Sequence, residues 1–175
     1  MAGPTLIPDS ESLELEELVA DDAGVTVVVR ASRPTACCPD CEQPATRVHS
    51  WYERRLGDLH WQGLPVRVRL YTRRWFCDAP GCTRRIFTER FPALVPPHGR
   101  RTARLSTLLT ALAFALGGRP GARLLAAIGP VVSHDTLINT IRQADLPPAP
   151  TPRVLGYSPS MCKNMPQGTV NLSLR

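Results

Sequence analysis

The sequence predicts an α+β protein in which a small antiparallel sheet is followed by a unit of three helices. Apolar and polar residues alternate through residues 66–71, which is the two-residue period of a strand. From about residue 103 the apolar residues recur at helical spacing instead. One cysteine pair precedes the alternating stretch and another follows it, which suggests that the two cysteine-containing loops lie close together in the fold. The first half of the chain is therefore expected to be mainly β and the second half α.

Length and charge restrict the class of protein. The 175 residues suit one domain or two small ones, and 43% hydrophobic residues exclude wholesale disorder. The formal charge of +6 is unevenly placed, since residues 1–30 carry −6 and residues 31–104 carry +8. An acidic arm over residues 1–23 would thus precede a basic middle. This asymmetry favours a polyanionic partner, and a solvated basic face is the alternative.

The thiols are expected to be reduced, because nothing in the sequence predicts export. The most apolar run, residues 105–116, is shorter than the roughly 20 residues of a membrane span. The acidic N-terminus lacks the basic and apolar regions of a signal peptide. We therefore expect a cytoplasmic protein without a membrane partner.

The two cysteine pairs have the spacing of zinc knuckles. Cys38 and Cys41 form a C-x2-C pair, and Cys77 and Cys82 form a C-x4-C pair whose turn contains Pro and Gly. Two such pairs in a small basic chain predict one structural Zn2+ held by four thiolates. Redox dithiols and buried structural thiols are the alternatives.

Three further residues could alter this ligand set. Cys37 could replace Cys38, but it would give a three-residue spacer, so Cys38 is preferred. His49 and His60 are possible fourth ligands if one cysteine is not used. A sixth cysteine, Cys162, lies in the tail.

Strand patterns surround the first knuckle and lead to the second. Strands are expected at residues 25–31, 46–52 and 66–76, with a turn at residues 58–65 that contains Gly63 and Pro65. Together they predict a zinc-ribbon domain over residues 24–95. The metal would supply stability that so few apolar residues cannot.

Arginines near these strands are candidate phosphate contacts, and on the last strand they alternate with aromatic residues. Basic residues beside aromatic rings suit phosphate contact and base stacking, whereas the alternative is a solvent face with rings packed under arginine stems. Arg90 and Arg104 extend the same basic surface. The predicted contacts are Arg67, Arg69, Arg73, Arg74, Arg84, Arg85, Arg100 and Arg101.

Three helices are expected after residue 100. The first spans residues 103–116 and ends at Gly117 and Gly118, the second spans residues 121–128, and the third begins at the N-cap Ser133. Residues 100–146 are thus predicted to form a helix-turn-helix-like domain, although many three-helix units pack this way without DNA. A Pro-rich linker and disordered tail are expected over residues 147–175. The candidate base readers on the third helix are Thr136, Asn139, Arg142 and Gln143.

Several longer motifs carry a resemblance to a known family. From about Leu13 to Gly156 the chain resembles the N-terminal part of a bacterial insertion-sequence transposase of the ISL-three type. The resemblance implies a zinc-binding region that recognises transposon ends and precedes a ribonuclease-H-like catalytic domain with a carboxylate triad. The matching motifs are residues 38–41, 48–50, 54–59, 73–77, 84–90, 117–124, 133–137 and 152–156.

The sequence departs from that family where the first catalytic carboxylate is expected. Gly156 is followed by Tyr157 and Ser158 instead of a Val-Asp-Asp segment, and neither Asp nor Glu occurs after Asp145. Two-metal strand transfer needs closely paired carboxylates, so we expect no enzymatic activity from this chain. The tail also holds the chain's only lysine, Lys163, which fits a frameshifted end, with a short natural tail as the alternative.

The combined expectation is a zinc-dependent DNA-binding transposase fragment that recognises terminal inverted repeats. Its expected partner is double-stranded DNA at transposon ends, with a second copy or an intact transposase as further candidates, and no small-molecule substrate. It would be nucleoid-associated when bound to DNA. The alternatives are the end-binding half of a split active transposase, and a protein-interaction zinc ribbon or inert remnant.

Overall fold

The computed structural model describes residue 8 and residues 11–144. The chain divides into two units, residues 1–144 and residues 145–175, and the second unit lies outside the described residues. The predictions for the linker and tail over residues 147–175, including Cys162, therefore fall outside the described part. The end of the family resemblance, residues 152–156, falls outside it as well.

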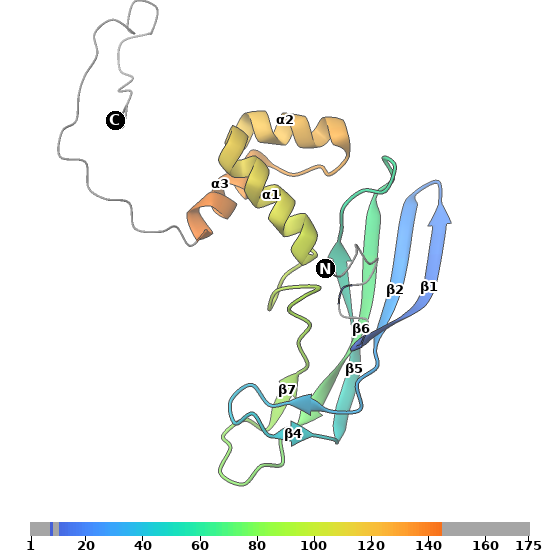
Figure 1. Ribbon diagram of the computed structural model, residues 1–175, viewed down its shortest axis with the longest axis vertical. Coiled ribbons are helices and arrows are strands. Elements are labelled where there is room, and N and C mark those ends of the chain that lie inside the picture. Colours follow the sequence, from blue (N-terminus) through green and yellow to red (C-terminus); the bar gives the residue numbers. More distant parts are fainter. Residues whose placement is uncertain (1–7, 9–10, 145–175) are drawn as a thin grey trace, which may run out of the picture. The chain divides into compact units, whose positions relative to one another are not determined.

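A five-stranded sheet and a separate two-stranded sheet form the β part of the molecule (Figure 1). The larger sheet has the order β1-β2-β6-β5, and β7 pairs with β6. The small sheet pairs β3 with β4 beside the first knuckle. The strands are β1 (Leu13–Asp21), β2 (Gly24–Ala31), β3 (Ala36–Cys37), β4 (Pro44–Ala45), β5 (Val48–Gly57), β6 (Val66–Phe76) and β7 (Ile86–Thr88).

The larger sheet corrects the prediction of a wholly antiparallel sheet. Strands β2 and β6 pair in parallel, with Val25 opposite Val66 and Arg30 opposite Tyr71. The other pairs are antiparallel. The parallel pair arises because the hairpin of β5 and β6 joins the sheet through β6, so that β5 becomes an edge strand.

The segment expected as an acidic arm contributes the other edge strand. Residues 13–21 form β1, which is antiparallel to β2. The signal was present in the sequence, since Leu13 and Leu15 alternate with Glu14 and Glu16. Only Leu13 of this strand is buried, so β1 is a largely exposed edge.

One face of the larger sheet carries the main core. Alternate residues of β6, namely Val66, Val68 and Leu70, are buried there. The segment after β7 covers them with Phe91, Leu94 and Val95. A second core around Trp75 and Phe87 contains two of the cysteines, Cys38 and Cys77. The knuckles are therefore packed on a hydrophobic base.

Three helices follow the sheet: α1 (Ala103–Leu116), α2 (Gly118–Ile128) and α3 (His134–Gln143). The Ser133 side chain accepts from the N–H of Thr136, which confirms the predicted cap of α3. Helix α2 begins three residues earlier than predicted, directly after Gly117, whose φ is 73°. Leu109, Leu125 and Leu137 form the centre of the helical core. None of the helices among the described residues is long and apolar enough to span a membrane.

A buried polar cluster joins the β5–β6 hairpin to α1. Thr102, the N-cap of α1, donates its hydroxyl proton to Asp58 at 2.6 Å, and Arg104 Nε donates to the same oxygen at 2.7 Å. Backbone hydrogen bonds also join the two segments here, because Gly57 N–H donates to the Arg100 carbonyl and Thr102 N–H donates to the Gly57 carbonyl, both at 2.9 Å. The start of α1 is thus fixed to the end of β5.

Candidate metal centre and basic groove

The four predicted cysteines converge. The Sγ atoms of Cys38, Cys41, Cys77 and Cys82 all lie within 4.8 Å of one another. Cys38 and Cys82 are 4.0 Å apart, and Cys41 and Cys77 are 3.6 Å apart. Four sulfurs bonded tetrahedrally to one zinc at about 2.3 Å would lie about 3.8 Å from one another. The sulfur positions therefore fit one zinc ion.

The knuckle turns aim backbone N–H groups at the sulfurs. Burial raises the pKa of the Cys38 thiol, but hydrogen bonds from the backbone of Asp40 and Cys41 outweigh it and lower that pKa to about 7. The backbone of Ala79 acts likewise on Cys77, yet burial and the neighbouring thiols raise its pKa to about 12. One thiolate is thus favoured without metal, and a zinc ion would be needed to keep all four deprotonated.

The alternative ligands do not join this cluster. Cys37 is exposed and is not part of it, so the choice of Cys38 is confirmed. His49 Nδ1 lies 2.9 Å from Ser50 Oγ, and its ring contacts Phe76 edge-on. His60 packs against Gly129 instead, where its Nδ1 is buried and has no hydrogen-bond partner among the described residues.

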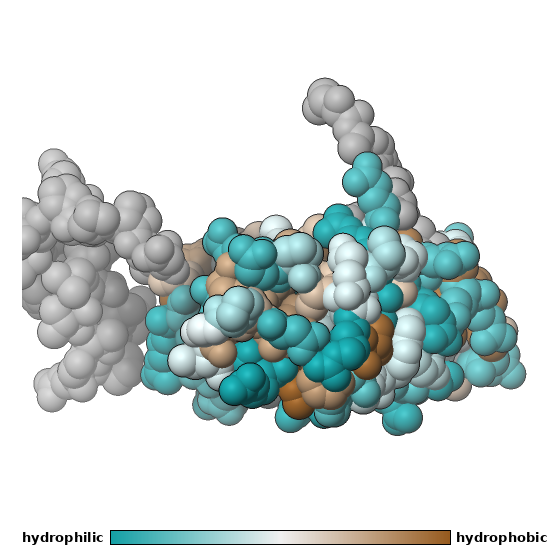
Figure 2. All heavy atoms as spheres, turned by 90° about the horizontal axis from the view of Figure 1, so that it is seen from below, coloured by the Kyte–Doolittle hydropathy of each residue, from teal (hydrophilic) through white to brown (hydrophobic). Residues whose placement is uncertain are grey.

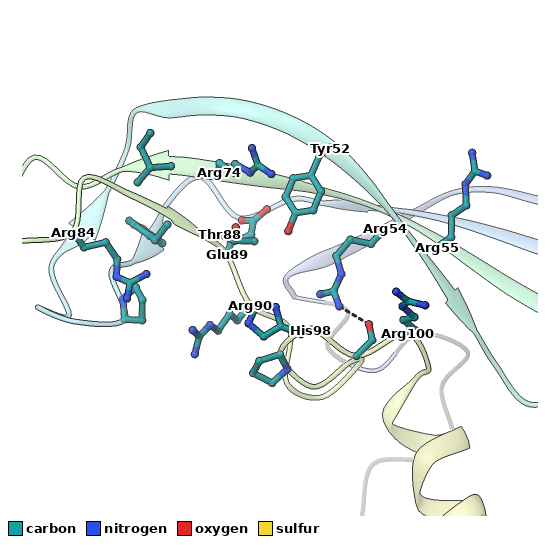
Figure 3. Close-up of a pocket in the computed structure, with 15 residues that line it drawn as sticks. Tyr52, Arg54, Arg55, Arg74, Arg84, Thr88, Glu89, Arg90, His98 and Arg100 are labelled. Carbon is teal, nitrogen blue, oxygen red and sulfur yellow. Dashed lines mark hydrogen bonds between the residues drawn. The ribbon is translucent and has the colours of Figure 1, made fainter. Parts of the chain in front are cut away.

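A groove of about 730 Å3 lies beside the knuckles. Figure 3 shows Tyr52, Arg54 and Arg74 on the two sheet strands, with Arg90, His98 and Arg100 across the cavity from them, while Arg55 points away. Pro39 of the first knuckle and Arg84, which follows the second, complete one end. Figure 2 views the molecule from the end that carries β4 and β7, where hydrophilic residues cover most of the described surface.

Most of the positive charge in this groove is not neutralised. Arg74, Arg90 and Arg100 are exposed, and none of them makes an ion pair with a described residue. Arg54 donates to the carbonyl of Gly99 at 2.6 Å rather than to a carboxylate. The one acidic residue of the lining, Glu89, is buried and already paired with an arginine outside the groove. The groove therefore has the chemistry of an anion site.

The opposite face of the sheet is different, and it holds three of the predicted phosphate contacts. The prediction for Arg73 is wrong, because its side chain is only 8% exposed and pairs with Glu89 at 3.0 Å. Arg69 donates to Glu53 and to the Tyr71 hydroxyl, at 2.8 and 2.6 Å. Arg67 is exposed on the same face.

Glu53 is the main counter-charge on that face. Hydrogen bonds from Arg69 first, and then from Arg55, lower the pKa of Glu53 to about 2. It is therefore ionised at neutral pH and offsets the arginines beside it. The face is thus internally paired. It also agrees with the alternative stated above, rings packed under arginine side chains, since the guanidinium carbons of Arg69 and Arg73 lie 5.6 and 4.6 Å from the ring centres of Tyr71 and Trp75.

The remaining predicted contacts are scattered. Arg85 is exposed, and Arg101 is half-buried where its backbone pairs with Gly57. On α3, Asn139, Arg142 and Gln143 are exposed, whereas Thr136 is held in the cap by Ser133. Of the predicted phosphate contacts, Arg74, Arg84 and Arg100 line the groove.

The groove residues that sequence reasoning missed include Tyr52, Arg54 and His98. The adjacent Arg54 and Arg55 were visible in the sequence, and in a strand they must point to opposite faces. The position of His98 on a loop opposite β5 had no sequence signal.

Two cysteine knuckles that converge beneath a small sheet define a zinc ribbon, with one structural zinc ion as its metal. Residues 34–82 match a family described as the zinc-finger of transposase IS204/IS1001/IS1096/IS1165. This segment is therefore similar to the zinc ribbon of transposases of that type. Comparisons with curated proteins and with solved structures found no match.

Proposed function

We propose that this chain is a zinc-dependent, duplex-DNA-binding part of a transposase that recognises the terminal inverted repeats of its element. The single observation that carries the proposal is the arginine-lined groove beside a zinc ribbon similar to that of transposases, where four arginines, Arg54, Arg74, Arg90 and Arg100, have no carboxylate partner among the described residues. Clustered, unpaired arginines attract the phosphate backbone and make binding depend on salt. The protein would then act at the nucleoid.

Two parts of the molecule would share recognition. The groove would contact phosphates, which position the protein without reading sequence. Helix α3 would supply the base contacts as the second helix of a helix-turn-helix-like unit, because Asn139, Arg142 and Gln143 are exposed along it. Asn and Gln pair with adenine and Arg pairs with guanine in the major groove.

We propose further that the chain does not itself catalyse strand transfer. The buried carboxylates of the described residues, Asp58 and Glu89, are each engaged by an arginine. Such pairs stabilise structure and leave no open oxygens for divalent metal.

Fluorescence anisotropy with labelled duplexes tests the function. One duplex carries the terminal repeat of the element that encodes the chain, and a second carries the same bases in scrambled order. We expect tighter binding to the repeat, a linear fall of log affinity with log salt, and loss of binding when a chelator removes zinc. Affinity that is equal with and without chelator, or no binding at low salt, would contradict the proposal.

A further inference from the structure

We propose that the groove between the β5–β6 hairpin and residues 96–100 holds the sugar-phosphate backbone of one DNA strand, and that zinc keeps one wall of this groove in place. The inference rests on the proposed DNA-binding function and names the surface that performs it. It selects this groove over the arginine-rich opposite face of the sheet, which the sequence pattern alone favours.

The distribution of carboxylates separates the two surfaces. In the groove, Arg74, Arg90 and Arg100 make no ion pair with the described residues, and Glu89 is turned toward Arg73. On the opposite face, Glu53 binds Arg69 and Arg55. A phosphate that approaches that face would meet an ionised carboxylate, whereas the one carboxylate of the groove lining, Glu89, is buried and already paired with Arg73. Charge complementarity therefore points to the groove.

The groove is also held in a fixed shape before any ligand binds. Arg54 Nη2 donates to the Gly99 carbonyl at 2.6 Å, which ties β5 to the 96–100 turn. The turn needs glycine, because a Cβ at Gly99 would lie 2.9 Å from Pro96 Cγ. On the other wall, the Arg74 guanidinium lies 5.0 Å from the centre of the Tyr52 ring. Arginines held in this way lose less entropy when they bind an anion.

The zinc site supports the groove at the end nearest the knuckles. Pro39 lies inside the first knuckle, and Arg84 lies two residues after Cys82 of the second. Arg84 Nε donates to Asp40 at 2.6 Å, so the wall spans both knuckles. When zinc is removed, the two knuckles would be held together by this exposed ion pair, a second exposed pair between Arg47 and Asp78, and the small core around Trp75. Loss of zinc should therefore open the groove.

The test compares arginine variants of the full chain with zinc bound. Arg74→Gln/Arg90→Gln removes two groove charges. Arg67→Gln removes one charge from the opposite face, and Arg123→Gln, on the exposed side of α2, is the matched control. Anisotropy with a duplex DNA of arbitrary sequence is measured over a range of salt, together with a single-stranded RNA of equal length. Zinc content and thermal unfolding confirm that each variant is folded.

We expect the groove variant to lower the salt slope by nearly 2 and to weaken duplex binding about 60-fold at 0.1 M salt, since each phosphate contact contributes about 0.9 to the slope. Arg123→Gln should bind like the parent. If the parent binds duplex DNA and the groove variant binds equally well, the groove is overturned and the DNA-binding function stands. An effect confined to Arg67→Gln, or tighter binding of the RNA, would also overturn it. A parent that binds no DNA refutes the function itself.

Discussion

Glu89→Gln should destabilise the ribbon strongly, because Glu89 is the buried acceptor that joins β7 to β6. Its Oε1 accepts from the backbone N–H and the Nε of Arg73 at 3.0 and 3.1 Å. Its Oε2 accepts from Arg73 Nη2 and Trp75 Nε1 at 3.0 and 3.3 Å. The Thr72 hydroxyl also donates to Oε1 at 3.4 Å, so Oε1 receives three donors and Oε2 receives two. In either orientation, the amide of glutamine would turn its NH2 group toward at least two donors.

The loss of charge adds to this mismatch. The side chains of Arg73 and Glu89 are only 8% and 4% exposed, so water cannot replace the carboxylate. Breaking one side of a buried ion pair typically costs about 3–5 kcal/mol. We expect a decrease of about that size in the free energy of unfolding, with an unchanged dependence on urea.

Urea denaturation with excess zinc, followed by tryptophan fluorescence, measures this change. Glu53→Gln is the matched control, because Glu53 is also a carboxylate paired with arginine, but its partners Arg55 and Arg69 are 84% and 41% exposed. Water can hydrate these exposed arginines when the carboxylate is lost, so the free energy of unfolding of Glu53→Gln should fall much less. A Glu89 variant that loses less than about 1 kcal/mol would refute the argument that burial gives this pair its importance.

Three other perturbations follow from the structure. Cys77→Ser should abolish stoichiometric zinc binding, whereas Cys37→Ser should retain it, as metal analysis of the purified proteins would show. Asp58→Asn should lower stability by about 2 kcal/mol or more in chemical denaturation, since it removes the buried partner of the α1 cap. Gly121→Ala should cost about 1–3 kcal/mol in the same assay, because its Cβ would lie 2.9 Å from Leu137 Cδ1.

The Asp58 prediction has a defined pH dependence. Burial alone would raise the pKa of Asp58, but hydrogen bonds from Arg104 and Thr102 outweigh it and hold the pKa below its ordinary value. A carboxyl whose pKa is lower in the folded state stabilises above its unfolded pKa, near 3.9, and loses that contribution as the pH falls through the folded value. The parent and the Asn variant should therefore converge in stability in acid. Parallel curves down to pH 2 would show that Asp58 contributes nothing through its charge.

The predictions for Cys77→Ser and Gly121→Ala can each be contradicted by a defined result. Full zinc content in Cys77→Ser would mean that the metal uses another ligand. Unchanged stability in Gly121→Ala would mean that α2 and α3 can move apart at no cost, contrary to the close contact at Leu137.

The metal centre and the helices could be predicted because their signals are local. Cysteine spacing determined the ligand set, and Ser133 marked the start of α3 about one turn before its buried Leu137. Strand β6 was also predicted with its observed bounds, from alternation alone.

The arrangement of the arginines could not be predicted, because it depends on which distant residue lies opposite each one. Arg73 and Arg74 are adjacent in the sequence. Arg73 nevertheless forms an ion pair with Glu89, the residue that follows β7, whereas Arg74 lines the groove. The parallel pairing of β2 and β6 was missed for the same reason, since no local pattern states which strands are neighbours.

A single hydroxyl, that of Thr102, both caps α1 by accepting from Leu105 N–H and donates to Asp58. Cutting the chain between β7 and Thr102 would therefore separate Asp58 from its donors Thr102 and Arg104, and would leave the cap of α1 without its carboxylate acceptor. Neither fragment should be expressed alone as an independent module, and hybrids that exchange the helices of related proteins should carry the residue equivalent to Thr102 together with its carboxylate partner.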